Sequence, residues 1–259
     1  MSIVVTHNSG FFSCCSVKLC DIIIYVNHHK ELPLQVDSSR QFDNYKIQNG
    51  DITYEYFIHP DNNPNFTVDS PINYYHDYQF RDYSQLDYEA LCPFVKKYFT
   101  PSHDVKNHIE SIQQKYNMDY DNICVLFYRG NDKNTETKIC GYDEYILFAN
   151  KILEKNPSIT FLIQSDETEF IELMHSTFPD NSFYLKDEVR HMNKCNNTVD
   201  NTMREDILEF SKKYLAITVI MSKCKYVVCG SGNCSIWIMF YRGNVNNVYQ
   251  NLDNNWIIN

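Results

Sequence analysis

The sequence predicts an α/β protein whose second half forms a doubly wound, parallel sheet. From about residue 121, short apolar runs rich in β-branched and aromatic residues alternate with longer helical patterns, which is typical of strands joined by crossover helices. Turn signals separate these runs, as at the Asn-Pro pair 156–157 and the Pro-Asp pair 179–180. A chain of 259 residues with 43% apolar residues is also large enough to bury such a core.

The elements of the second half can be placed in order. The predicted strands are 123–128, 159–164, a short one near 183, 225–229 and a last one near 248. The predicted helices are 142–153, 167–177, 204–221 and 235–241. Since the carboxyl ends of parallel strands meet at one edge of a sheet, we expect the polar residues that follow these strands to lie together.

The first half has a weaker pattern. Its predicted elements are a strand at 3–6, a glycine-containing turn at 10–13, an apolar helix to about residue 26, a strand at 34–37 and helices between 86 and 116. Residues 59–84, rich in Asn, Asp, Pro and Tyr, predict a surface loop. The change of pattern predicts two domains, an N-terminal α/β lobe at 1–118 and a C-terminal Rossmann-like lobe at 119–259.

Composition limits the partners. The formal net charge of -10 and the pI of about 5.3 make nucleic acid and anionic membranes poor partners. No run approaches the roughly 20 apolar residues of a membrane span, and the amino terminus lacks a signal-peptide pattern. The ten cysteines lie mostly in apolar runs without repeated C-x2-C pairs, which indicates buried free thiols and no metal site. We therefore expect a soluble cytoplasmic protein.

The most informative segment follows the strand predicted at 123–128, where the sequence continues Arg-Gly-Asn-Asp-Lys at 129–133. Ligands of open α/β sheets bind beyond the carboxyl ends of the strands. Arg129 there, beside a glycine that lets backbone approach closely, suits an anionic group. The segment predicts a site for a phosphate or diphosphate.

Two more segments are expected at the same edge. They are Ser-Asp-Glu at 165–167 and Gly-Ser-Gly-Asn at 230–233, and the second offers free backbone N–H groups at a helix start. Alone, these features have simpler interpretations: a surface ion pair between Arg129 and Asp132, a helix cap and a tight turn. Their shared location favours a phosphate-containing ligand held between Arg129 and the helix start.

The order of these segments resembles the nucleotide-binding half of the fucosyltransferase superfamily, which includes the α1,6-, α1,2- and protein O-fucosyltransferases. The family's first motif is an H-x-R-R-x-D strand end, often followed by Lys. The segment at 127–133 is similar to it and keeps the first arginine, the aspartate and the lysine. Glu136 and Tyr145 follow at nearly the spacing of the α1,6 branch.

Two further motifs extend the resemblance over about residues 121–245. The segment at 161–167 resembles an apolar strand that ends in Ser/Thr-Asp-Asp, and the segment at 221–233 resembles an L-S-x-A/C-x-x-x-V-x-x-x-S-S pattern. The resemblance implies a GT-B-like fold, with two Rossmann-like lobes, parallel sheets and a cleft between them.

The resemblance also implies a function. It implies an inverting, metal-independent glycosyltransferase of glycan biosynthesis, which moves fucose or a related deoxysugar from a nucleoside-diphosphate sugar such as GDP-fucose to a glycan or other hydroxyl acceptor. It implies no cofactor besides this donor substrate. The catalytic residues implied are Arg129, Lys133 and, as the base, Glu136. The nucleotide-sugar-binding residues implied are Arg129, Asp132, Tyr145, Asp166, Glu167, Ser231, Gly232 and Asn233.

The sequence departs from the family pattern at several positions. Phe127 stands at the motif histidine, Gly130 at the second arginine and Gly232-Asn233 at the final Ser-Ser, and residues 216–218 lack the acidic residue that reads guanine. The base of the donor stays open, and a non-catalytic nucleotide-sugar or glycan-binding protein of the same fold is the alternative. A phosphotransfer enzyme would need a Walker-type loop or a metal site, and neither is found. His76 is a second, weaker candidate base.

Overall fold

The computed structural model describes residues 1–59, 70–188, 190–202 and 205–259. Its largest sheet has six strands in the order β10-β9-β8-β5-β6-β7. The pairs among β5 to β9 are parallel, and β10 is antiparallel to β9. The strands are β5 Ile123–Tyr128, β6 Thr160–Ser165, β7 Ser182–Tyr184, β8 Tyr226–Gly230, β9 Val248–Leu252 and β10 Asn255–Ile258. The predicted parallel α/β sheet is confirmed.

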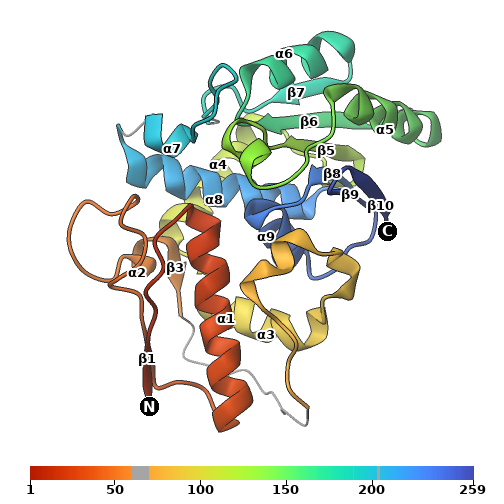
Figure 1. Cartoon of the computed structure of the whole chain (residues 1–259). Helices are drawn as coiled ribbons and strands as arrows, with labels where there is room; N and C mark the ends of the chain where they lie inside the picture. Colours follow the sequence, from red (N-terminus) through yellow and green to blue (C-terminus); the bar gives the residue numbers. More distant parts are fainter. Residues whose placement is uncertain (60–69, 189, 203–204) are drawn as a thin grey trace.

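Helices cover both faces of this sheet (Figure 1). Val125 and Phe127 of β5 enter one apolar cluster, whereas Cys124 and Leu126 enter another, because successive side chains of a strand point to opposite faces. The helices on the Leu126 face are α5 Tyr142–Lys155 and α6 Thr168–Thr177. The helices on the Val125 face are α4 His103–Lys115, α8 Ile207–Lys223 and α9 Asn233–Arg242. The predicted start of α8 at residue 204 lies outside the described residues.

The pairing register aligns the ends of the three central strands. Tyr128 of β5 is opposite Ser165 of β6, and Phe127 is opposite Cys229 of β8. The segments that follow β5, β6 and β8 therefore begin at one edge of the sheet. This is the geometry that the sequence predicts for its three polar segments.

The first half builds a smaller lobe. β1 Ser2–Val4 and β2 Gln35–Asp37 form a parallel pair joined by α1 Phe11–His29, and β3 Phe57–Ile58 pairs antiparallel with β4 Thr100–Pro101. The other elements described in the first half are α2 Thr53–Tyr56, η1 His76–Phe80, η2 Tyr83–Gln85 and α3 Tyr88–Tyr98. The short elements η3 Tyr120–Asn122, η4 Asn131–Thr135 and α7 Val199–Thr202 belong to the second half. Within the described residues, the first lobe thus keeps a β-α-β start with one pair of parallel strands.

The two halves share one apolar core. α1 packs against α9, where Trp237 Nε1 donates to Ser16 Oγ at 3.0 Å and the ring of Phe12 lies 6.2 Å from that of Trp237. α4 of the first half packs along α8 of the second. The domain division at residue 118 stays a prediction, because buried side chains on both sides of it belong to one cluster.

The apolar helix of the first half is longer than the sequence pattern predicts. By length and composition α1 could cross a membrane, which corrects the prediction that no stretch approaches a span. It is a core helix in this fold, because 67% of its apolar window is buried. All ten cysteines are free, and eight of them are buried, as predicted.

The predicted surface loop at 59–84 is only partly described, because residues 60–69 lie outside the described ranges. Its described aromatic residues pack mainly into the protein: Tyr74, Tyr78 and Tyr83 are buried, whereas Tyr75 is exposed. This packing favours a structural role for the aromatic residues of η1 and η2.

Candidate functional site

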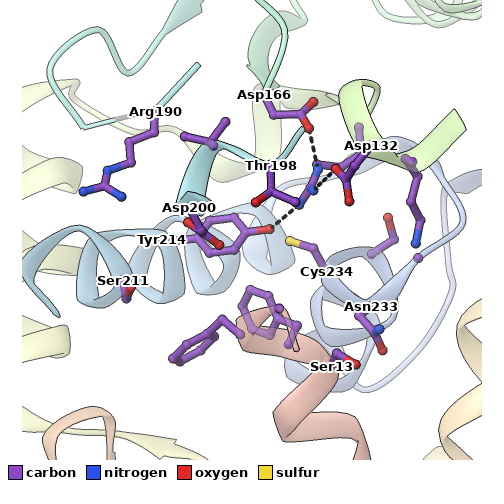
Figure 2. A pocket seen from close by; sticks show the side chains of 18 of the residues that line it. Ser13, Asp132, Asp166, Arg190, Thr198, Asp200, Ser211, Tyr214, Asn233 and Cys234 are labelled. Atoms are coloured by element: carbon purple, nitrogen blue, oxygen red, sulfur yellow. Dashed lines mark hydrogen bonds and ion pairs between the residues drawn. The ribbon is translucent and has the colours of Figure 1, made fainter. Parts of the chain in front are cut away.

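A cavity of about 430 Å³ lies at the carboxyl edge of the large sheet and reaches the first turn of α1 (Figure 2). Its volume is typical of small-molecule sites. Eight of the predicted site residues line it: Arg129, Asp132, Lys133, Glu136, Asp166, Ser231, Gly232 and Asn233. Residues 9–13 of the first lobe line it as well, so both lobes contribute to the cleft.

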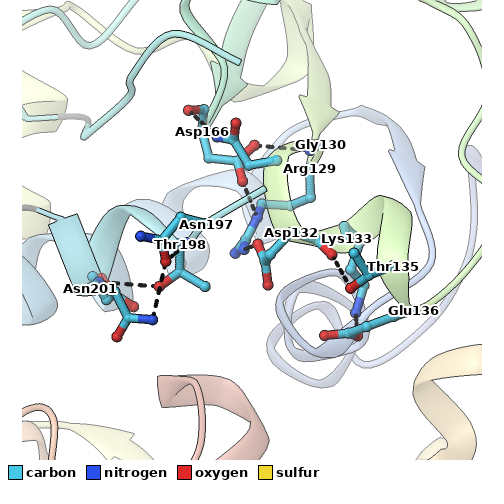
Figure 3. Close-up of polar contacts among 12 residues, drawn as sticks. Arg129, Gly130, Asp132, Lys133, Thr135, Glu136, Asp166, Asn197, Thr198 and Asn201 are labelled. Carbon is cyan, nitrogen blue, oxygen red and sulfur yellow. Dashed lines mark hydrogen bonds and ion pairs between the residues drawn. The ribbon is translucent and has the colours of Figure 1, made fainter. Parts of the chain in front are cut away.

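Arg129 directly follows β5 and is held by side chains from the end of β6, from η4 and from α8 (Figure 3). Its Nε donates to Asp166 Oδ2 at 2.9 Å, and its Nη atoms lie 3.4 Å from Asp132 Oδ1 and 3.3 Å from Tyr214 Oη. Burial disfavours the charge, but the neighbouring Asp166, Tyr214 and Asp132 hold the pKa of Arg129 well above its usual value. Because a guanidinium carries five N–H groups and a third of this side chain is exposed (32%), donors remain for a ligand.

Gly130 and Glu167 fit together across β5 and β6. A Cβ atom at position 130 would lie 2.0 Å from Glu167 Oε1, so the acid fills the place of a side chain there. The Glu167 carboxylate accepts from the Asn131 amide at 2.6 Å and from the Tyr142 hydroxyl. Asp166 accepts from the Gly130 amide at 3.0 Å. The segment after β6 therefore fixes the segment after β5. A steric reason also explains why glycine, and not the second arginine of the fucosyltransferase motif, stands at position 130.

Lys133 lies against the start of α9. A Cβ atom on Gly232 would come within 3.0 Å of Lys133 Cε, so glycine at this position gives the lysine room. Lys133 Nζ pairs with Glu136 Oε2 at 2.5 Å and lies 4.8 Å from the ring centre of Phe80. The lysine ammonium is thereby held at the same side of the cavity as the first turn of α9.

Of the backbone donors predicted at this helix start, at 231–233, two are engaged within the protein. The amide and hydroxyl of Ser231 both donate to Asn251 O at 2.8 Å, and the Gly232 amide donates to the hydroxyl of Tyr83 at 2.9 Å. These donors are already used within the protein. The amides of the first turn of α9, beginning at Asn233, have no partner within the helix. A ligand anion would therefore meet α9 itself rather than the preceding turn.

Two predicted nucleotide-sugar-binding residues lie away from the cavity. Tyr145 is fully buried on α5, and its hydroxyl donates to Phe127 O at 3.0 Å. Glu167 is fully buried and is engaged as described above. Their assignment to the donor stays a prediction, and the observed contacts give both residues a role in positioning the end of β5.

Several cavity residues were not identified from the sequence. Tyr214 projects from α8 toward Arg129, Asp200 accepts from the Tyr45 hydroxyl at 2.7 Å, and the guanidinium of Arg190 lies 4.0 Å over the ring of Phe210. In Figure 2, Arg190 and Asp200 lie at one side of the cavity, and Asp132 and Asn233 lie at the other. Arg190 and Asp200 lie in the polar segment that follows β7, whereas Tyr214 lies within α8.

Metal ligands are not gathered in the described part of the chain. Within residues 1–59, 70–188, 190–202 and 205–259, no three His, Cys, Asp or Glu side chains are grouped as for a metal ion. The cations that face the cavity are side chains of the protein, chiefly Arg129 and Lys133. An anionic ligand can therefore be bound directly by the protein.

A two-lobed α/β fold with a ligand-sized cavity at the sheet edge is the architecture of a GT-B protein. No family model matches the chain, and no curated protein matches it by sequence. Several solved structures resemble it along its whole length. Among them are NodZ alpha-1,6-fucosyltransferase co-crystallised with GDP (TM-score 0.61, 11% identity, 98% of that chain covered), the same enzyme soaked with GDP-fucose (0.58, 11%, 99%) and fucosyltransferase NodZ from Bradyrhizobium (0.59, 12%, 98%).

All three comparisons cover 100% of this chain. At such identities the likeness concerns the fold. The chain thus has a fucosyltransferase-like, GT-B fold, as the sequence motifs predict.

Proposed function

We propose that this protein is a glycosyltransferase that uses a nucleoside-diphosphate sugar, with GDP-fucose as the first candidate donor. The observation that carries the proposal is the convergence of Arg129, Lys133 and the first turn of α9 on one cavity. This convergence occurs in a fold shared with structures of NodZ obtained with GDP and GDP-fucose. The acceptor is a glycan or another molecule with a hydroxyl group.

The proposed reaction is a single displacement with inversion. When the bond between the anomeric carbon and the diphosphate breaks, negative charge develops on the leaving phosphate. Arg129 and Lys133 would bind that phosphate and stabilise the charge, together with the free amides and the dipole of α9. One preorganised donor of this kind typically contributes about 10²- to 10³-fold in rate, so these cations replace the need for a metal ion.

The acidic residues around Arg129 act mainly in positioning. Asp166 holds both the Arg129 guanidinium and the Gly130 amide, so it fixes the cation relative to the strand end. Burial raises the pKa of the Asp132 carboxyl, against the opposing effect of Arg129. Glu136 lines the cavity but is paired with Lys133. Its role as the base stays a prediction.

The nucleoside is assigned to the side of the cavity with Arg190 and Asp200. Asp200 carries carboxylate oxygens that accept base N–H groups, and Arg190 has a buried Nη1 without a hydrogen-bond partner. A guanine presents both a carbonyl acceptor and N–H donors, and these match the two residues. Ala216 and Ile217 of α8, where the family has an acidic residue, are buried apolar side chains.

Thermal stabilisation by nucleotides tests this proposal. The purified protein is melted with GDP, UDP, GDP-fucose and UDP-glucose, each with magnesium and with EDTA. A ligand at 100 times its Kd adds about 2.7 kcal/mol of stability, and we expect a shift with GDP and GDP-fucose that magnesium does not change. Binding without release of GDP from GDP-fucose would favour the non-catalytic alternative, and a shift with none of the four would refute the donor assignment.

A further inference from the structure

Among the described residues, each carboxylate that lines the cavity already has a partner. The five acidic residues found there each accept a hydrogen bond or ion pair: Asp132 and Asp166 from Arg129, Glu136 from Lys133, Glu188 from Lys115 and Lys213, and Asp200 from Tyr45. These contacts direct the carboxylates toward donors and cations of the protein. A neutral imidazole is another group that can accept the proton of an acceptor hydroxyl.

The first lobe supplies one. His7, in the connection between β1 and α1, lies with its Nε2 2.9 Å from Oγ of Ser13. Ser13 belongs to the first turn of α1 and lines the cavity. Among the described residues, no other histidine is hydrogen-bonded to a side chain that lines the cavity.

The packing of α1 on α9 places Ser13 opposite the proposed phosphate site. The Trp237-to-Ser16 hydrogen bond joins the two helices, and Ser13 and Asn233 each lie about one turn before it. Figure 2 shows the side chains of Ser13 and Asn233 together at the bottom of the cavity. A sugar attached to a phosphate at the start of α9 would thus be bordered by the hydroxyl of Ser13.

We propose that Ser13 and His7 form a proton relay for the acceptor hydroxyl. This inference rests on the proposed function. The acceptor oxygen bonds to the anomeric carbon while its proton passes to Ser13 Oγ, and the proton of Ser13 passes to His7 Nε2. The bond from the anomeric carbon to the phosphate oxygen breaks, and its electron pair leaves with the nucleoside diphosphate. The imidazolium then releases the proton to solvent.

The surroundings of His7 suit this role. Burial, with a smaller contribution from His76 of η1, lowers the pKa of His7, so its imidazole is neutral and can accept a proton at pH 7. Among the described residues, the Cys14 thiol also contacts His7 and donates to its carbonyl at 3.3 Å. For the relay, neutral His7 must carry its proton on Nδ1 and leave Nε2 free to accept from Ser13.

The first test reads this tautomer directly, without turnover. The imidazole nitrogens of the ¹⁵N-labelled protein are observed by NMR between pH 5 and 8, and the His7→Gln variant assigns the signal. We expect a neutral Nδ1–H imidazole at pH 7.5 whose midpoint lies below the ordinary histidine value. An Nε2–H tautomer or an imidazolium at pH 7.5 would overturn the relay.

The second test measures GDP release from GDP-fucose with water as the acceptor. We expect His7→Gln and Ser13→Ala each to lower kcat by about 10²-fold, to leave GDP affinity unchanged and, for His7→Gln, to remove the acid limb of the pH profile. His175→Gln is the matched control, because His175 Nδ1 contacts Ser182 Oγ at the same 2.9 Å on the exposed surface of α6. Both His7 and Ser13 variants are first checked for a wild-type melting temperature.

The outcomes separate the relay from the donor assignment. Normal binding of GDP with unchanged kcat and pH profile in His7→Gln and Ser13→Ala would refute the relay and leave the proposed function intact. A wild-type protein that binds neither GDP nor GDP-fucose would refute the proposed function and the relay with it. Loss of GDP affinity in either variant would give these residues a structural role and would also refute the relay.

Discussion

Replacement of Gly130 by alanine tests whether Glu167 fills the space of a missing side chain at the end of β5. The added Cβ would lie 2.0 Å from Oε1 and 2.1 Å from Cδ of Glu167, well inside van der Waals contact. Glu167 is fully buried, and its carboxylate holds the Asn131 amide and the Tyr142 hydroxyl. The acid cannot move aside without losing both hydrogen bonds.

The magnitude follows from those two bonds. Hydrogen bonds to a charged group contribute about 1.5 to 3 kcal/mol each, so their loss costs roughly 3 to 6 kcal/mol of unfolding free energy. For a chain of this size, 1 kcal/mol corresponds to about 2 to 4 °C in Tm. We therefore expect Gly130→Ala to lower Tm by at least roughly 6 °C, measured by calorimetry.

Two further variants make this test specific. Gly230→Ala, at the end of the neighbouring strand, is the matched control, because its Cβ would only touch Tyr145 Oη at 3.7 Å. In a Glu167→Ala background the space is open, so adding Gly130→Ala should cost little more, and the two changes should be coupled by most of the roughly 3 to 6 kcal/mol that Gly130→Ala costs alone. Wild-type stability of Gly130→Ala, or full additivity in the double variant, would refute the reasoning.

Three other predictions concern the cavity. Arg129→Lys keeps a charge beside Asp166 but loses the planar guanidinium fork, so kcat for GDP release from GDP-fucose should fall about 10²-fold with a small change in Tm. Arg81→Lys is the control, because Arg81 forms an exposed ion pair. Equal rates in the two variants would contradict the prediction. Because the pKa of Asp132 is raised on folding, the native state takes up this proton more readily than the unfolded state, and stability is lost as pH rises through the folded pKa. Asp132→Asn should therefore have a Tm at least as high as that of the wild type in melts at pH 7, and the difference in Tm should be smaller at pH 4. A variant whose Tm is lower than that of the wild type only at pH 7 would contradict the predicted direction of the pH dependence. Glu136→Gln should keep the pH profile of the wild type in steady-state kinetics, whereas a loss of kcat of about 10²-fold would make Glu136 the base, as predicted from sequence.

The sequence predicted the fold and the candidate site best where the same residues end a strand and line the cavity. The strand end at Arg129, the segment at Asp166 and the turn before Asn233 were all predicted, because apolar runs that end in polar residues mark the carboxyl ends of parallel strands. The register of β5 with β6 and β8 then brings these segments to one cavity. The resemblance to fucosyltransferases predicted the fold on the same motifs.

Contacts between distant segments were not predictable. The Tyr83 hydroxyl accepts a hydrogen bond from the amide of Gly232, 149 residues away. No local sequence pattern links a tyrosine in a polar segment to a glycine turn. The fit of Glu167 into the space at Gly130 likewise depends on the exact register of two strands. The short strands of the first lobe are hard to identify because two- and three-residue strands have almost no periodicity.

His7 illustrates the same limit at the site. A single histidine after a short strand has no distinctive spacing, and only the hydrogen bond to Ser13 relates it to the cavity. The packing of α1 on α9 determines which side chains of the first lobe face the second.

The most direct test of the account is a crystal structure of the protein with GDP in the presence of EDTA. The account predicts that the β-phosphate lies within hydrogen-bonding distance of Arg129 and the first-turn amides of α9, with Lys133 beside it and no metal ion between them. A diphosphate bound elsewhere, or one that reaches Arg129 only through a metal, would contradict the proposed donor site.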